Sequence, residues 1–348
     1  MMKEMDTLVT VAIASCNNAE HLARCVDSAL DQTYAKLEVI VVDDGSMDRT
    51  LEVLAQYRDR ANIRIIGKEN GGLSSVRQRG LDEAAGEYIC FIDADDYLLP
   101  EYVETMMDRI RTDRADVCVC SVRVEDTDGR VRERDTQTFT VAERPPLQVR
   151  PEALSRRHAD LSGLLSLSDS WNKLYRTEFL RESGVRFTLP KGYNGTDLAF
   201  NHKLALFSPR YAFVPATLYC HVLYPVSAVR RRKKELQTGF QYIISEIIDE
   251  SKRAGNFPVM AGKISNLHFY LLRLALQDRM DETDGFRARW REARAARAQE
   301  RAFAASRPDL PRSLRHIETR SLQVFHALFQ CLPAALPLYF KARRKLTA

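Results

Sequence analysis

Short apolar runs alternate with helix-like segments along the first hundred residues of the chain. Continuous apolar runs rich in β-branched residues are typical of buried strands. They cover residues 8–14, 37–42, 63–66 and 88–92. Between the runs, apolar residues recur at helical spacing, as in Leu22, Val26 and Ala29. This alternation predicts right-handed crossovers and a doubly wound, mixed α/β sheet.

The pattern changes beyond residue 100. It predicts a helix over 100–111, a strand over 115–122, a hairpin over 123–141 around Asp128-Gly129, a helix over 151–167, a strand over 218–224, and helices over 237–248, 265–276 and 287–301. We therefore divide the chain into a sheet-based domain over 1–230, with halves 1–122 and 123–230, and a basic helical extension over 231–348.

Acidic residues directly follow two of the predicted strands. Asp43 and Asp44 end the second strand, and Asp93, Asp95 and Asp96 end the fourth. Open α/β sheets bind ligands at the carboxyl ends of their strands. Two carboxylates one residue apart there suit a hard divalent cation that also takes phosphate oxygens from a substrate. The alternative is that Asp95 or Asp96 caps the helix that begins near Pro100.

The glycine signatures of the common nucleotide sites are missing. No GxGxxG follows the first strand, which ends in Ser15-Cys16-Asn17-Asn18, and the chain has no GxxxxGK[ST]. Strand-end acids indicate another way to bind a nucleotide. One carboxylate accepts the imide N–H of uracil, and a second acidic site holds the diphosphate through a metal.

Charge and cysteine usage restrict the partners and the compartment. The net charge is +5, and basic residues gather at 230–234, 287–320 and 341–345. Such clusters indicate a nucleic acid or an anionic membrane surface, or they are solvated helix faces. Seven cysteines without a CxxC pair predict a reducing cytoplasm. The start of the chain shows no signal-peptide pattern, and the apolar tract over 324–340 is too interrupted to predict a spanning helix.

Several ordered motifs together resemble family 2 glycosyltransferases of the GT-A fold, the type that builds bacterial surface polysaccharides. They lie at 11–17, 28–34, 38–48, 69–74, 77–80 and 86–96. The resemblance is strong over residues 8–122 and looser to about residue 230. Ala14 and Cys16 stand where the family often has Pro and Tyr. Neither change removes a charge, so we expect little effect on donor binding.

The resemblance implies a site for a nucleotide sugar, most simply a UDP-sugar. Asp43 resembles the residue that reads the nucleobase, and Arg77 resembles a basic residue near the ribose or diphosphate. Asp93 and Asp95 resemble the DxD pair that holds Mn²⁺ or Mg²⁺, with Asp93 also towards the ribose. The remaining residues that the matched motifs place at the nucleotide sugar are Ala14, Ser15, Asn17, Asp44, Asn70, Gly71 and Ala94.

Two later segments also resemble the family. Segment 170–176 contains Lys173, which the resemblance places near the diphosphate, and Trp171 and Tyr175, which either stack on sugars or pack in the core. In segment 192–200, Asp197 resembles the catalytic base, which takes a proton from the acceptor hydroxyl. A helix start would stabilise its charge, although Thr196 stands where the family usually has Glu. The alternative for Asp197 is a helix cap.

A last candidate lies in the predicted strand over 218–224. His221 resembles a metal or diphosphate ligand of some family members, and the alternative is a packed strand histidine.

The sequence thus predicts an inverting, metal-dependent glycosyltransferase that acts on a hydroxyl of a glycan or lipid-linked glycan. Residues 322–345 are either an interfacial helix on the cytoplasmic membrane face or part of a helical subdomain. One rival is a nucleotidyltransferase, which usually carries a glycine-rich basic loop after the first strand. Another is a nucleic-acid binder, which leaves the strand-end acids unexplained. The prediction requires Asp43, Asp95 and Asp197 to open onto one pocket.

Overall fold

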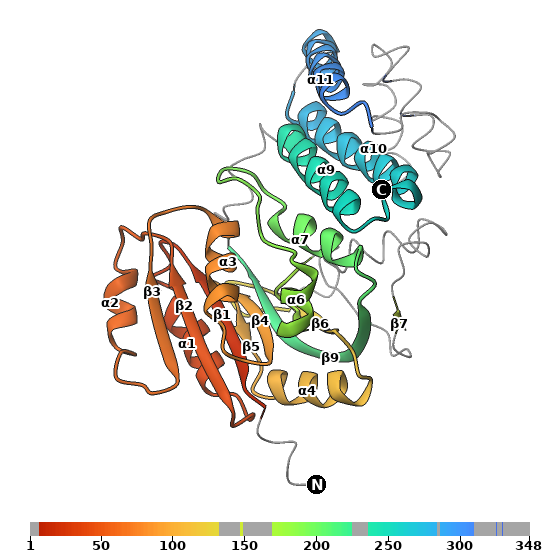
Figure 1. Ribbon diagram of the computed structural model, residues 1–348. Coiled ribbons are helices and arrows are strands. Elements are labelled where there is room, and N and C mark those ends of the chain that lie inside the picture. The colour runs from red at the N-terminus through yellow and green to blue at the C-terminus, as the bar shows by residue number, and fades with distance from the viewer. Residues whose placement is uncertain are drawn as a thin grey trace. The chain divides into compact units, whose positions relative to one another are not determined.

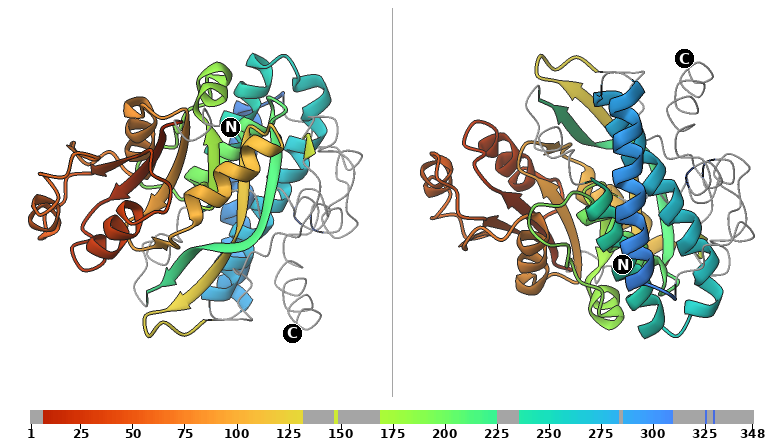
Figure 2. Two further views of the ribbon diagram at one scale, coloured as in Figure 1. Left: turned by 90° about the horizontal axis from the view of Figure 1, so that it is seen from below. Right: turned by 90° about the horizontal axis from the view of Figure 1, so that it is seen from above.

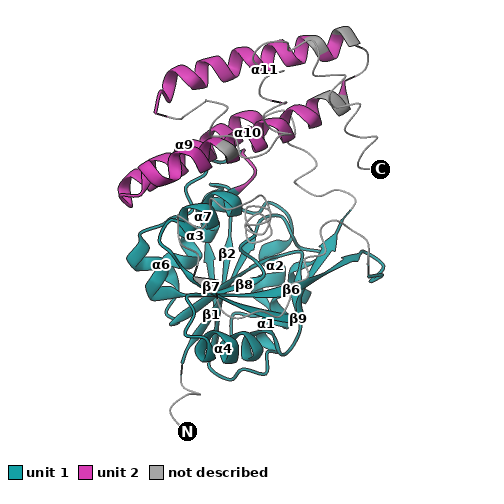
Figure 3. Ribbon diagram, turned by 90° about the vertical axis from the view of Figure 1, so that its right-hand side faces the viewer, with its two compact units in different colours: residues 1–150, 164–192, 196–227 teal, residues 151–163, 193–195, 228–348 magenta. Residues whose placement is uncertain are grey.

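The computed structural model describes residues 7–131, 147–148, 169–224, 236–283, 286–309, 325 and 329. It divides into two compact units (Figure 3). Unit 1 comprises residues 1–150, 164–192 and 196–227, and unit 2 comprises 151–163, 193–195 and 228–348. The predicted helix over 151–167, the hairpin beyond Val131 and the basic run 230–234 lie outside the described residues.

Unit 1 is built on a mixed sheet of nine strands within the described residues (Figure 1). The strand order is β3-β2-β1-β4-β8-β6-β9-β5, and β7 pairs with β9. Strands β3, β2, β1 and β4 run parallel to one another, whereas β8 is antiparallel to both β4 and β6. The strands are β1 (Val9–Ser15), β2 (Leu37–Asp43), β3 (Ile63–Gly67), β4 (Tyr88–Asp93), β5 (Tyr97–Leu98), β6 (Val117–Asp126), β7 (Leu147–Gln148), β8 (Lys173–Arg176) and β9 (Arg210–Leu223).

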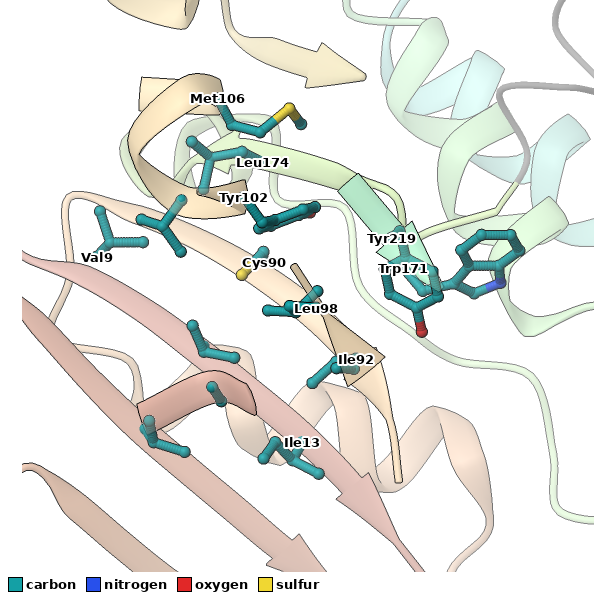
Figure 4. Packing of buried hydrophobic residues seen from close by; sticks show 14 of the residues in the cluster. Val9, Ile13, Cys90, Ile92, Leu98, Tyr102, Met106, Trp171, Leu174 and Tyr219 are labelled. Carbon is teal, nitrogen blue, oxygen red and sulfur yellow. The ribbon is translucent and has the colours of Figure 1, made fainter. Parts of the chain in front are cut away.

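Helices cover both faces of this sheet, which Figure 2 shows from two further sides. They are α1 (Leu22–Leu30), α2 (Thr50–Ala55), α3 (Leu73–Glu83), α4 (Tyr102–Thr112), α6 (Thr177–Ser183) and α7 (Thr196–Ala205). Successive residues of a strand point to opposite faces. Val39 and Val41 of β2 therefore pack in the core with α1 and α4, while Ile40 and Val42 pack with Val76 of α3. Figure 4 shows part of the larger core around Cys90, Tyr102 and Met106.

The α/β prediction and its first four strands are confirmed, and the structure corrects several details. Strand β9 begins at Arg210 and not at residue 218. The N-cap of α4 is Glu101, so the capping alternative for Asp95 and Asp96 is wrong. Strand β8 and helix α6 were not predicted.

Unit 2 is helical where it is described. It contains α9 (Leu236–Arg253), α10 (Phe257–Glu282) and α11 (Phe286–Ser306). Its apolar core also contains Phe325 and Phe329, whose stacked rings lie 5.8 Å apart between centroids. These two residues belong to segment 322–345, predicted as either an interfacial helix or part of a helical subdomain, and the rest of that segment lies outside the described residues. In the described part of the chain, we find no helix with the length and apolarity needed to cross a bilayer.

Candidate active site

The candidate site lies at the carboxyl ends of β1, β2 and β4. Strand register pairs Ser15 with Asp43 on one side of β1, and Ala14 with Asp93 on the other. Neighbouring strands lie about 4.8 Å apart, so the Asp43 and Asp93 backbones are separated by roughly two such spacings. The acids that follow two predicted strands therefore flank the same strand end.

Arg77 of α3 joins two acids that are far apart in sequence. Its side chain is buried, and its Nη2 donates to Asp93 Oδ1 at 2.6 Å while Nη1 donates to Asp197 Oδ1. Burial disfavours the charged guanidinium, but the Asp197 and Asp93 carboxylates outweigh it and raise the pKa of Arg77. Asp197 and Asp93 thus share one cation. That Arg77 lies near the ribose or diphosphate of a donor stays a prediction.

The adjacent acids Asp43 and Asp44 have different surroundings. The Asp43 carboxylate accepts hydrogen bonds from the backbone N–H of Ser46 at 3.1 Å and from its hydroxyl at 2.5 Å. Asp44 accepts the N–H groups of Gly71 and Gly72, both at 2.8 Å, and the Lys68 ammonium at 2.6 Å. Asp44 therefore fixes the loop that starts α3.

Side-chain bonds join the three loops that follow β1, β2 and β3. Asn17 Oδ1 accepts the Met47 N–H at 2.8 Å, and Asn70 Nδ2 donates to Cys16 Sγ at 3.2 Å. A Cβ on Gly71 would lie 2.7 Å from Ser75 Oγ, so any other residue there would require Ser75 to shift. The buried Ser15 hydroxyl has no partner among the described residues. A ligand that fills this edge of the sheet would satisfy it.

The turn after β4 holds Asp95 and Asp96 against β9. Asp96 is 1% exposed and accepts the Tyr219 hydroxyl at 2.7 Å, the Val222 N–H at 2.9 Å and His221 Nδ1 at 3.1 Å. Burial works against a charged imidazole, but the bond to Asp96 raises the pKa of His221 to about 9. Trp171 stacks on the His221 ring at 5.5 Å between centroids.

Crowding also perturbs the neighbouring acid. Burial, together with the charges of Asp96 and Asp93, raises the pKa of Asp95 to about 7. A cation at this turn would relieve that repulsion. The described residues contain no ready group of three metal ligands. The two carboxylates of Asp93 and Asp95 match an ion of the Mg²⁺ type, which takes one or two protein carboxylates and completes its shell with substrate phosphate and water.

Helix α7 presents Asp197 in its first turn and is fixed to its surroundings by side-chain bonds. Asn201 Nδ2 donates to the Asp197 carbonyl oxygen and to Ser170 Oγ, both at 3.1 Å. Thr196 begins the helix, and its hydroxyl lies 3.0 Å from Ser74 Oγ of α3. The threonine that replaces the usual glutamate therefore supports α7 through a hydroxyl. Asp197 itself lies inside the helix, beyond the cap position.

Segment 169–173 contacts α7 through Ser170 and ends in a buried lysine. Lys173 is fully buried, and its ammonium donates to Asn172 Oδ1 at 2.8 Å and to the Asp169 carbonyl oxygen. Burial, offset in part by Asp169, lowers the pKa of Lys173 to about 8. The Lys173 ammonium, which the resemblance places near the diphosphate, thus forms hydrogen bonds within the turn that precedes β8. Tyr175 is buried with its hydroxyl on Asn201, which favours the core alternative for this residue.

Sequence reasoning did not assign roles to Asp96 and Asp169. Asp96 had a signal, since it is the third acid in four positions, but its partners on β9 follow it by more than 120 residues. Asp169 had no signal beyond a single acid before the 170–176 motif.

A buried histidine on α7 gives the first testable prediction. The Leu198 carbonyl oxygen lies 2.8 Å from His202 Nδ1, which must donate, so the neutral ring leaves Nε2 bare. That atom is buried without a partner among the described residues, and burial lowers the pKa of His202 to about 4. In the unfolded chain the His202 ring has its ordinary pKa of 6.5, so between pH 6.5 and 4 the unfolded chain binds a proton that the folded chain does not. Stability from this group is complete above pH 6.5 and is lost as the pH falls towards 4, by up to ~3 kcal/mol.

We expect His202→Asn, which keeps a donor for Leu198 but cannot titrate in this range, to flatten the pH dependence of unfolding. The measurement is the free energy of urea unfolding from pH 4 to 7 for both proteins. Parallel curves would show that His202 does not couple protonation to folding.

Comparisons with known proteins place this geometry in context. The family described as Glycosyl transferase family 2 matches residues 10–183. EpsH of Bacillus subtilis, which is named as a glycosyltransferase, is 31% identical over 232 residues, 66% of this chain and 64% of that protein. The chondroitin synthase of Pasteurella multocida is 42% identical over 113 residues, 32% of this chain and 12% of that protein. The chain thus covers less than two thirds of the length of these relatives.

The fold also has solved counterparts. The crystal structure of Staphylococcus aureus TarS 1–349 in complex with UDP-GlcNAc has a TM-score of 0.70 at 18% identity, over 97% of this chain and 92% of that chain. TarS 1–349 in complex with UDP has a TM-score of 0.66 at 20% identity. The likeness shows that the two chains share a fold.

Proposed function

The chain belongs to glycosyl transferase family 2, and from this membership we propose that it transfers a sugar from a UDP-sugar to a hydroxyl of a glycan or lipid-linked glycan. One observation carries the proposal: Arg77 holds Asp197 beside Asp93 at the strand ends. In this proposal Asp197 is the base, and Asp93 belongs to the acids on the donor side. The UDP and UDP-GlcNAc complexes of the TarS fold support a uridine nucleotide as the donor.

Asp43 binds the base of the donor in this proposal. Its carboxylate, held by Ser46 at the end of β2, accepts the imide N–H of uracil. Asp44 stays a predicted contact of the donor, and its oxygens also accept from Lys68 and from the N–H groups of the glycine loop. Its task is to keep Asn70 and Gly71 in place along the nucleotide.

Asp93, Asp95 and His221 are the residues that would hold a divalent cation. Asp96 supports this set by accepting a hydrogen bond from His221 Nδ1, the usual arrangement around metal-bound histidines. Bound there, Mn²⁺ or Mg²⁺ stabilises the negative charge that develops on the leaving diphosphate.

Asp197 acts as the general base. Its carboxylate takes the proton of the acceptor hydroxyl while that oxygen forms a bond to the anomeric carbon and the bond to the diphosphate breaks. A single displacement inverts the configuration at the anomeric carbon and needs no covalent nucleophile. Arg77 orients Asp197 by donating a hydrogen bond to its carboxylate.

Product analysis tests this function. The protein is incubated with UDP-glucose, UDP-galactose, UDP-GlcNAc or UDP-GalNAc, with Mn²⁺ or Mg²⁺ and a lipid-linked glycan extract. We expect UDP from at least one donor and a sugar added to the acceptor fraction. Release of pyrophosphate from a nucleoside triphosphate and a sugar phosphate, without UDP, would instead favour the nucleotidyltransferase alternative.

Chelation gives the second testable prediction. We expect EDTA to reduce UDP release to background and added Mn²⁺ or Mg²⁺ to restore it. Asp95→Asn removes a ligand charge and should raise the metal concentration needed for half-maximal rate at least tenfold. Asp59→Asn, at an exposed position, is the matched control and should behave as the wild type. Full activity in EDTA would contradict the proposal that transfer requires a divalent cation.

A further inference from the structure

Asp169 is a half-buried acid at the site that the proposed mechanism does not use. It is the first residue of the turn that leads into β8. Its neighbour Ser170 accepts a hydrogen bond from Asn201, which also bonds the Asp197 carbonyl oxygen. On the other side, Trp171 stacks on His221. The turn that carries Asp169 is therefore fixed between the proposed base and the candidate metal ligand.

Lys173 and Asn172 also fix this turn through hydrogen bonds. The buried ammonium of Lys173 donates to the carbonyl oxygen of Asp169 and to the side chain of Asn172. Asn172 Nδ2 in turn donates to the Cys120 carbonyl oxygen of β6 at 3.0 Å. A carboxylate on a turn this well fixed loses little side-chain entropy when it binds a ligand.

The charges around Asp169 come from both sides of the reaction. Burial and Asp197 raise the pKa of Asp169 to about 6, while Lys173, Arg77 and His221 oppose them. Any sugar in transfer must have its anomeric carbon between the leaving diphosphate and the acceptor oxygen. In the proposed mechanism those two groups lie towards His221 and Asp197, respectively, and the turn that carries Asp169 is fixed to both through Trp171 and through Ser170 with Asn201.

We propose that the Asp169 carboxylate accepts hydrogen bonds from hydroxyls of the transferred sugar and thereby selects the donor; this inference rests on the glycosyl transfer proposed above. An ionised carboxylate is an acceptor only, so it matches neighbouring hydroxyl donors. Sites that bond a substrate hydroxyl discriminate strongly against analogues without it, because a buried polar group is then left unpaired. No bond is made or broken at Asp169.

The test compares the wild type, Asp169→Asn and Asp169→Ala in the full chain. Binding of UDP alone is measured by thermal shift, and kcat/KM by UDP release from the four UDP-sugars named above. Deoxy analogues of the preferred UDP-sugar complete a double-mutant cycle. Asp108→Asn, exposed on α4, is the control for removing one acid.

For both variants we expect UDP affinity within about twofold of the wild type. The kcat/KM of the preferred sugar should fall about tenfold to a hundredfold, and the preference over its epimer should largely disappear. With the wild type, the deoxy analogue that lacks the contacted hydroxyl should show a similar fall in kcat/KM relative to the preferred UDP-sugar. With Asp169→Ala, removing that hydroxyl should lower kcat/KM little further.

Two outcomes would overturn the inference, and they differ. Equal losses for every UDP-sugar, or none, would show that Asp169 does not select the sugar. No UDP release by the wild type from any UDP-sugar would remove the proposed transfer itself and the Asp169 role with it.

Discussion

Replacing Asp197 with asparagine should lower kcat about 10²–10⁴-fold, the usual contribution of a positioned general base. Asparagine has nearly the same shape, and its side-chain oxygen still accepts from Arg77, so the Arg77–Asp93 ion pair should survive. It cannot take a proton from the acceptor hydroxyl. The measurement separates single-turnover transfer from equilibrium binding of the UDP-sugar, and we expect only transfer to fall.

A variant that turns over like the wild type would contradict the assignment of Asp197. Asp169 is the alternative to examine then, since the charge of Asp197 acts on it and its neighbour Ser170 is bonded to Asn201 of α7. If Asp169 were the base, Asp169→Asn would lose transfer with every donor. Under the present assignment it changes the choice of donor. The two variants therefore test each other.

The sheet edge and its acids were predictable because they depend on local pattern. Buried apolar runs predicted β1, β2 and β4, and the residues after them had to meet at one edge once the strands paired in parallel. Strand register then puts Asp43 and Asp93 on opposite sides of the β1 end, as the sequence requires. Roles taken from the family resemblance, such as that of Asp197, remain predictions about chemistry.

The contacts made by long-range pairing were not predictable. Arg77 is 120 residues from Asp197, and Asp96 is 125 residues from His221, so only the folded sheet brings them together. The start of β9 was missed for a local reason. Pro215 and Ala216 fall at a register shift against β6. Because proline interrupts a strand pattern in the sequence, the residues from Arg210 to Val214 were not predicted as part of β9.

Removing the Arg77 charge should have the largest effect on stability. We expect Arg77→Met, a substitution of similar length, to cost about 3–5 kcal/mol of unfolding free energy and to abolish transfer. The arginine side chain is 1% exposed, and its loss leaves Asp93 and Asp197, which are 28% and 18% exposed, without their shared cation. An unpaired charge in a partly buried site is the costly state, more than the loss of the pair itself. Urea unfolding at pH 7 measures the cost.

A triple variant separates this electrostatic cost from lost packing. Adding Asp93→Asn and Asp197→Asn to Arg77→Met removes both stranded charges, so the triple variant should regain most of the lost stability without any activity. If the triple variant is no more stable than Arg77→Met, the cost arises from packing around α3. If Arg77→Met unfolds within about 1 kcal/mol of the wild type, the acids do not depend on Arg77, and the convergence of the base and donor acids needs another cause.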